Sequence, residues 1–555
     1  MRRACVGGKE ACRASNMNKF LSPIDLAIIF GSIALVVFVG IWIGRRRSDT
    51  AQGYFLANRS MPWFVAGSAF IASGISSEQM VGTVGATYQY GLGIGNWEWF
   101  IWPAYTLPLL LFIPIYLKNR VTTVPGFLAN RFGPAVGTIY TCVLLFVYAF
   151  VYLVTVLYSG SLVFSQIMGW NLHVVVFLVA ILVGGYSIKG GLVSVMWTDM
   201  IQCGLLTIGG LVLFWVAMSK LPGGVFGAWH TMEAASPERM HLYRPPNDTV
   251  APLLGMVCAV FGSFTFYQVG NQTMIQRILA ARSTWDGLMG LVMAGFLGFL
   301  RPMITCFLGL AVYQWIQVMH KAPLLADKDL AFTFALKNMA PTWGVRGVVV
   351  AGLIAAVMAT MSGLVNSVAT LFTIDLYKKF INKDASEHRM VRVGQISAFT
   401  ALMIAASLAP IVGKLGGIFQ FFQTALTYIA CPFMATILMG ILWKRVNYAA
   451  GVFGLTGGLV IQVIVAILFS GKVAGLPKLH FFYVGFIAQI FIAIGIVIVT
   501  LLTPPPDPEK IKGLIWNFNM LRHYDDAKPR PWYQQIKFWW TLLLVGNIII
   551  YWRFW

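Results

Sequence analysis

The stretch AGSAFIASGISSEQMVGTVG, residues 66–85, predicts the fold more directly than any other part of the chain. Its ends are apolar enough for a membrane helix, but its middle, residues 73–79, collects small and polar side chains that favour an interruption. A break in a helix frees backbone carbonyls and amides, which hydrocarbon tolerates only where they line a cavity or hold an ion. The stretch therefore predicts a broken helix at a binding site inside a membrane.

The composition of the whole chain is that of a membrane protein. Of its 555 residues, 58% are hydrophobic and 11% are charged, and the mean hydropathy is +0.75, outside the soluble range. The formal net charge is +21, yet Lys and Arg lie in short segments between apolar runs rather than on one basic face, which argues against nucleic-acid binding. The seven cysteines have neither CxxC nor metal-ligand spacing, so they predict no disulfide framework.

Apolar runs of about 20 residues can each cross a hydrocarbon core about 30 Å thick. The sequence contains fourteen such candidates, which predict an all-α, multi-pass membrane protein. They lie near residues 25–44, 62–86, 97–117, 137–167, 173–188, 199–218, 251–271, 287–316, 346–373, 392–412, 416–442, 450–470, 481–502 and 536–552.

The placement of Lys and Arg predicts how the chain is oriented. With the N-terminus outside, the inner segments carry the majority of the 40 Lys and Arg residues, as the positive-inside rule requires. These inner segments include the ones that carry Arg45, Arg120, Lys189, Arg277 and Arg445. We expect a location in the plasma membrane, or in the inner membrane of a bacterial cell.

A second interruption lies five spans after the first, in FGSFTFYQVGNQTMIQR, residues 261–277. Because five is odd, two five-helix repeats would cross the membrane in opposite senses. The predicted inverted repeats are 62–218 and 251–445, with an outer loop at 219–250 between them. The other predicted segments are an N-terminal tail or misplaced start at 1–16, a first flanking span with its inner loop at 17–61, two flanking spans at 446–502, an inner Pro-rich and charged linker at 503–535 and a last span at 536–555.

Six segments of the chain resemble motifs of the sodium/solute symporter family, particularly its sodium/sugar cotransporter branch. They occur in the family's order and cover nearly the whole chain. They are GYFLANRSMPWF (53–64), FIASGIS (70–76), GGLVSVMWTDMIQ (190–202), NQTMIQR (271–277), NSVATLFTIDLY (366–377) and ILWKRVN (441–447). The resemblance implies a LeuT-type fold, with five plus five core helices and alternating access around a central site.

The resemblance also implies a sodium site at the first interruption. Sodium is a hard cation that prefers oxygen ligands, which a helix break supplies as free carbonyls. Carried over by motif, the ligands are the carbonyls of Ala72, Ile75 and Ala356 and the hydroxyl of Thr360. Ala359 stands where the family has a second hydroxyl, so a weakened sodium site and a different coupling ion both stay open. The alternative for Thr360 is a hydroxyl that bonds the carbonyl one turn back.

A second sodium site, found in some members of the family, needs an acid and further hydroxyls. Asp199 and Ser362 match its pattern, but Ala359 and Gly363 do not, so we expect one coupling ion. Asp199 would then guide this ion towards the cytoplasm. The alternative is an acid that the helix dipole favours at the N-terminus of the sixth span.

For the solute, the family's sugar site matches the chain at Gln79, Glu98, Tyr267 and Gln423. Carboxylate and amide groups can bond vicinal hydroxyls, and an aromatic ring covers the apolar face of a sugar. Trp97 adds aromatic surface beside them. The alternative for each polar residue is a hydrogen bond between helices.

Other positions depart from the sugar-carrier pattern. Gly74 and Phe264 stand where sugar carriers have asparagine, and Gly298 stands where they have lysine, with Arg301 one turn further on. Glu78 occupies a position where this branch has a small residue, and a buried acid is costly in a membrane. It could pair with Arg301, bind a cationic or hydroxylated solute, take a proton, or face an aqueous vestibule.

Together these features predict a secondary active transporter that imports a sugar-like, polyhydroxylated solute with one sodium ion and works as a monomer in the lipid bilayer. The first alternative keeps the fold but carries an acidic sugar or amino acid, with Arg301 as the anion partner. The others are a membrane-embedded enzyme and a passive channel. An enzyme is disfavoured because the sequence has no HExxH or GxSxG motif and its histidines fall in loops or at the ends of spans.

Overall fold

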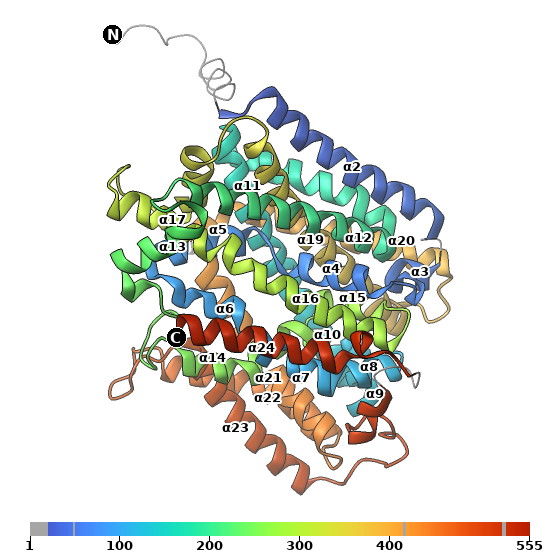
Figure 1. Cartoon of the computed structure of the whole chain (residues 1–555). Helices are drawn as coiled ribbons and strands as arrows, with labels where there is room; N and C mark the ends of the chain where they lie inside the picture. The colour runs from blue at the N-terminus through green and yellow to red at the C-terminus, as the bar shows by residue number, and fades with distance from the viewer. Residues whose placement is uncertain (1–19, 48–49, 415–417, 524–528) are drawn as a thin grey trace.

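The computed structural model describes residues 20–47, 50–414, 418–523 and 529–555, and within these residues every regular element is a helix. Figure 1 shows the helices packed against one another in one bundle. The longer ones are α2 (Pro23–Arg47), α4 (Trp63–Gly74), α5 (Ser77–Tyr90), α10 (Pro134–Val147), α11 (Leu153–Met168), α12 (Leu172–Ser219), α13 (Gly224–Ala235), α16 (Thr284–Ile304), α19 (Val345–Thr370), α20 (Glu387–Leu408), α21 (Ile418–Leu442), α22 (Tyr448–Leu468), α23 (Phe481–Leu502) and α24 (Ile536–Phe554).

Eleven helical segments of the described residues are long and apolar enough to cross a membrane, against the fourteen spans that the sequence predicts. Three differences account for the number. The broken helix is split into α4 and α5, both too short to be counted alone. The predicted spans at 173–188 and 199–218 are joined in α12, and α24 is not among the eleven.

The two predicted spans of α12 meet at a kink rather than at an inner loop around Lys189. Gly191 has φ 58° and ψ −168°, outside the helical region. A Cβ atom at this position would lie 2.9 Å from the carbonyl oxygen of Tyr54. Only glycine combines this backbone conformation with so close an approach, so the turn between the two halves of α12 needs no loop.

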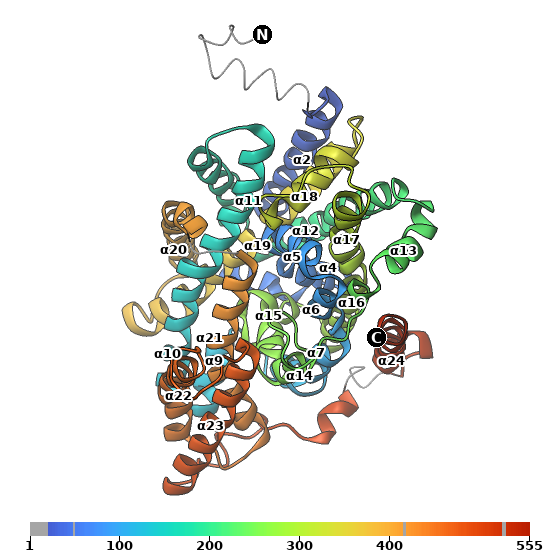
Figure 2. The same ribbon diagram turned by 90° about the vertical axis from the view of Figure 1, so that its left-hand side faces the viewer.

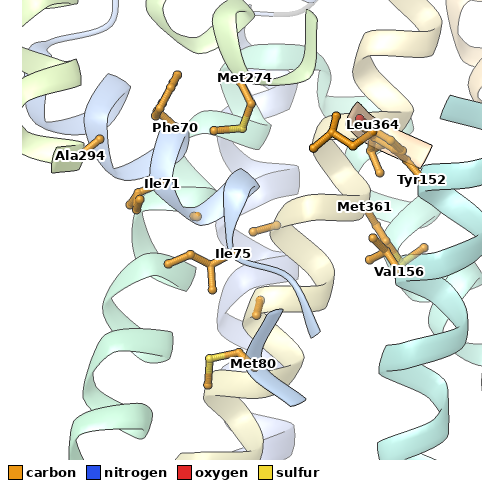
Figure 3. Packing of buried hydrophobic residues seen from close by; sticks show 14 of the residues in the cluster. Phe70, Ile71, Ile75, Met80, Tyr152, Val156, Met274, Ala294, Met361 and Leu364 are labelled. Atoms are coloured by element: carbon orange, nitrogen blue, oxygen red, sulfur yellow. The ribbon is translucent and has the colours of Figure 1, made fainter. Parts of the chain in front are cut away.

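The first interruption lies where the sequence predicts it. After α4 ends at Gly74, Ile75 and Ser76 are extended, with ψ angles of 103° and 179°, and α5 begins at Ser77. Figure 3 shows Ile71 before this break, Ile75 in it and Met80 after it, among other buried apolar side chains. The second interruption is spread over a longer stretch, because η6 (Val260–Phe264) and η7 (Phe266–Gly270) are π-helical before the chain becomes extended at Asn271 and enters α15 (Gln272–Leu279).

The broken helix lies near the middle of the bundle. Figure 2 shows α4, α5 and α19 there, with α22 and α23 at one edge and α24 at another. α19 is almost wholly buried and packs against α12, while α4 packs against α16. The first interruption is therefore surrounded by protein, which is the environment that an irregular backbone requires at membrane depth.

Candidate ion and solute site

The break in the first interrupted helix faces a hydroxyl of α19. The last hydrogen bond of α4 runs from the amide of Ile75 to the carbonyl of Ile71, 3.1 Å apart. Thr360 donates from Oγ1 to the carbonyl oxygen of Ile75 across the break, at 3.4 Å. Its hydroxyl proton is therefore directed away from the carbonyl one turn back in α19. Ala72 of α4 and Ala356 of α19, the other two predicted ligand positions, are both buried.

The oxygens at this break are neutral. In the part of the chain that the structure describes, no group of three or more His, Cys, Asp or Glu side chains could hold a metal ion. Carbonyl and hydroxyl oxygens are ligands that suit a hard cation, and they add no formal charge to the site. The donor set at the break therefore fits a monovalent cation that binds and leaves, rather than a tightly held transition metal.

Close to this break, Asp199 forms a buried ion pair with Arg277. Its Oδ2 is 3.0 Å from Nη2 of Arg277, and both side chains are fully buried. Ser362 of α19 donates to Oδ1 at 3.2 Å, and Oγ of Ser73 in α4 lies 3.4 Å from Oδ2. The carboxylate thus joins α12, α15, α19 and the end of α4. Arg277, which the sequence places in an inner loop, lies instead in the protein interior.

The structure bears on the helix-dipole alternative for Asp199 and gives a reason for the glycine at position 363. Asp199 lies about two turns past the kink of α12, so the first-turn helix dipole does not explain it. A Cβ atom at Gly363 would overlap Nη2 of Arg277. The missing side chain at position 363 therefore makes room for the guanidinium group.

Six of the seven predicted solute-site residues line one cavity of about 70 Å³. They come from five different segments, which the fold brings together at the second half of the broken helix. They are Gln79, Trp97, Glu98, Tyr267, Arg301 and Gln423. The side chain of Glu78, the seventh, is outside the part that the structure describes.

Inside the cavity the polar side chains pair with one another. Arg301 of α16 forms an ion pair with Glu98 through Nη2, and both side chains are largely buried. Its Nη1 donates to Oε1 of Gln79 at 3.2 Å. The hydroxyl of Tyr267 donates to the carbonyl of Gly74 at 3.4 Å, so the break has one hydroxyl on its solute side and that of Thr360 on its ion side. Because Glu98 and Arg301 carry opposite charges, together they add no net charge to the cavity.

An aromatic cluster covers one side of the cavity. Trp97 stacks on Phe481, with ring centroids 6.0 Å apart, and lies 4.8 Å from Phe482. Phe264 lies 5.7 Å from Phe482 and 5.9 Å from Trp97. Phe264, which departs from the sugar-carrier pattern, thus belongs to this cluster. The sequence does not indicate Phe481 and Phe482 as part of this cluster, because nothing in the local pattern at the start of α23 shows what it packs against.

A broken helix that directs free carbonyls at a hydroxyl, beside a polar cavity in a multi-pass bundle, defines a membrane transporter. Residues 54–458 match the family described as the sodium:solute symporter family, and the chain belongs to this family. It is therefore a sodium-coupled solute symporter and not an enzyme, and membership of this family implies Na⁺ as the coupling ion.

Curated relatives and a solved structure agree with this assignment. The chain is 33% identical to the sodium/glucose cotransporter of Vibrio parahaemolyticus over 467 residues, which cover 80% of this chain and 85% of that protein. It is 30% identical to the sodium/myo-inositol cotransporter of Bos taurus over 568 residues, which cover 93% and 78%. A sodium-coupled sialic acid symporter in a substrate-bound, outward-open state superposes with a TM-score of 0.75 at 21% identity, covering 87% of this chain and 99% of that one. This similarity shows that the fold is LeuT-like.

Proposed function

We propose that the protein imports a neutral, polyhydroxylated solute, a sugar or a sugar-like polyol, together with one sodium ion by alternating access. The observation that carries this proposal is the ion pair between Glu98 and Arg301 inside the cavity. We assign solute binding to Gln79, Glu98, Tyr267, Gln423, Trp97 and Arg301, and sodium binding to Ala72, Ile75, Ala356 and Thr360. Asp199 is assigned to the ion's path towards the cytoplasm.

The ion pair favours a neutral solute over a carboxylate. A carboxylate that bound Arg301 would have to displace Glu98 or lie beside it, and two close negative charges repel strongly where water is scarce. A neutral diol needs no such displacement, since it can accept from the guanidinium and donate to the oxygens of Glu98 or Gln79. The pair therefore supports the sugar-like solute over the acidic alternative.

The size of the cavity supports a transport cycle with more than one conformation. Its free space is about 70 Å³, and the polar side chains around it are bonded to one another. A hexose placed between these side chains would have to part some of them, so we infer that the lining moves when the solute binds. The aromatic cluster of Trp97, Phe264, Phe481 and Phe482 covers the cavity and would move with it.

The names of two relatives indicate a class of solute that this chain could transport. Two of them are described as sodium/glucose and sodium/myo-inositol cotransporters. Both of these named solutes are neutral and carry several hydroxyl groups, which is the chemistry that the paired charges and amides of the cavity can bind. We therefore propose that one of these two solute types is the substrate.

We further propose how the chain sits in its membrane. It crosses fourteen times with its N-terminus outside, because the broken helix, the two halves of α12 and α24 add three crossings to the eleven counted ones. The inverted repeats are 62–218 and 251–445. The protein works as a monomer in the plasma membrane, or in the inner membrane of a bacterial cell.

The test is uptake into proteoliposomes driven by an inward sodium gradient. Unlabelled glucose, galactose and myo-inositol are compared as competitors with glucuronate, sialate and amino acids, and a potassium gradient and protein-free vesicles serve as controls. We expect neutral hydroxylated solutes to compete and carboxylates not to. Inhibition by carboxylates alone would reject the proposed solute class. Thermal stabilisation by the same compounds, measured with and without sodium, gives a second readout that does not depend on reconstitution.

A further inference from the structure

The segment that carries Trp97 and Glu98 is itself an interrupted helix. α6 (Asn96–Trp99) ends at Phe100, whose ψ of 34° is outside the helical range, and α7 (Ile101–Leu107) follows. The sequence explains the interruption, because Pro103 has no N–H and its ring displaces the carbonyl four residues back, that of Trp99. The same interruption separates the amide of Trp102 from the carbonyl of Glu98, which it would bond in a continuous helix. Two backbone groups therefore need partners at a depth where water is scarce.

One side chain of α24 supplies both partners. Asn547 accepts from the amide of Trp102 through Oδ1 at 2.8 Å and donates through Nδ2 to the carbonyl of Trp99 at 2.6 Å. A side-chain amide is well suited to this position, because it carries an acceptor and donors side by side. Asn547 is itself buried, so its amide is committed to the interruption and not to solvent.

Other residues of α24 contact the same segment on both sides of Asn547. The hydroxyl of Tyr551 donates to Oδ1 of Asn96 at 2.8 Å. Phe554 stacks on Trp99 with ring centroids 5.8 Å apart, and Trp540 lies 5.0 Å from Trp102. Figure 1 shows α24 running past α6 and α7. The helix therefore lies along the whole interruption.

The end of α24 is fixed to α13 and to the segment that follows it. The amide of Leu242 donates to the carbonyl of Phe554 at 2.6 Å. Arg553 forms a two-pronged ion pair with Glu233 of α13, at 2.8 and 3.2 Å. These contacts hold α24 in register with the segment that it covers.

We propose that Asn547 is a positioning residue that orients Glu98 towards Arg301, and that α24 thereby takes part in solute recognition. Asn547 lies outside residues 54–458, the part that matches the family. It touches neither the cavity nor the ion site and acts through the backbone that directly follows Glu98, at Trp99 and Trp102. The role in recognition rests on the proposed solute site, whereas the support of the interrupted helix does not.

The test compares three variants of α24 in the full-length protein. Asn547→Leu keeps the approximate volume but removes both hydrogen bonds, and Asn547→Gln keeps the amide. Leu543→Ala is the matched control, because Leu543 is buried one turn earlier and packs beside Gly295 of α16. We expect Asn547→Leu to raise the solute concentration for half-maximal uptake roughly tenfold, which corresponds to about 1.4 kcal/mol, with the sodium dependence unchanged. Asn547→Gln should recover part of this loss, and Leu543→Ala should lower thermal stability alone.

Amide hydrogen exchange gives a readout without any solute. The amides of residues 100–102, 104 and 105 should exchange faster in Asn547→Leu than in Leu543→Ala, because Trp102 loses its acceptor. Equal exchange in these two variants, or an unchanged solute affinity in Asn547→Leu, would overturn the proposal. Glu98→Gln is measured in parallel. If it leaves solute affinity unchanged, the proposed solute site fails, and the exchange data still decide whether Asn547 supports the interruption.

Discussion

Glu98 and Arg301 are opposite charges in the interior of a membrane protein, and each is stable there because the other is beside it. Removing one partner of a buried pair leaves an uncompensated charge and typically costs about 3–5 kcal/mol, whereas replacing both can be close to neutral. We expect Glu98→Gln and Arg301→Gln each to lower the unfolding temperature. The double variant should regain most of that stability but not solute binding. Single variants as stable as the parent would contradict the pairing.

The hydroxyl of Thr360 is the side-chain donor at the break that we assign to sodium. Thr360→Ala should raise the sodium concentration for half-maximal uptake by at least about tenfold, the change expected for the loss of about 1.4 kcal/mol. Thr360→Ser should stay near the parent. Ala359→Ser is the converse change, since it adds a hydroxyl where the family has one, and it should lower the sodium requirement. An unchanged sodium dependence in Thr360→Ala would place the ion elsewhere.

His480 makes the start of α23 sensitive to acid. Its imidazole accepts from the amide of Phe482 at 3.3 Å as an N-cap, which requires the unprotonated nitrogen. Burial lowers the pKa of His480 from 6.5 to about 4. Because the folded-state pKa is below the unfolded-state value, this stabilisation is present above pH 6.5 and is lost as the pH falls from there towards 4. Compared with His480→Asn, an N-cap that does not titrate, the parent should lose roughly 1–2 °C of unfolding temperature between pH 7 and pH 5. Parallel pH profiles would contradict this.

At the scale of elements, the pair of Asp199 and Arg277 joins α12 to α15 and leaves no space at Gly363 of α19. Gly363→Ala should therefore displace the guanidinium and destabilise the fold by about 1–3 kcal/mol, as overpacking does. The matched control is Gly204→Ala in α12, where a Cβ atom would meet nothing within 4 Å. This change should be neutral or stabilising, by up to about 1 kcal/mol. Thermal unfolding of both variants measures the difference, and equal effects would show that the contact at Gly363 is not tight.

At the scale of the whole molecule, the single set of neutral oxygens at the break predicts that one positive charge crosses the membrane with each solute molecule. One sodium ion releases about 2.3 kcal/mol per 100 mV of membrane potential and about 1.4 kcal/mol per tenfold gradient, together ~3.7 kcal/mol. This sustains accumulation on the order of several hundredfold. Simultaneous measurement of current and labelled solute uptake should give a charge-to-solute ratio of one. A ratio of two would require a second ion site.

Much of the candidate site could be predicted from single stretches of sequence. The small and polar residues at 73–79 predict the break, and the matching motifs predict that Gln79, Glu98, Tyr267 and Gln423 lie together, as they do around one cavity. What these residues contact could not be predicted. Arg301 belongs to none of the matching motifs and lies one turn after a position that departs from the sugar-carrier pattern. It nevertheless forms the ion pair that sets the charge of the cavity.

The sequence by itself determined that this chain is a helical membrane protein with interrupted helices, because apolar length, small-polar clusters and proline act through neighbours in the chain. Only the tertiary structure decided that Arg277 lies buried against Asp199, that Phe482 covers Trp97, and that Asn547 completes the helix interrupted at Pro103. Each of these contacts joins segments far apart in sequence. A buried charge or a free backbone group has to find a partner, but its own segment does not specify which distant residue the fold places beside it.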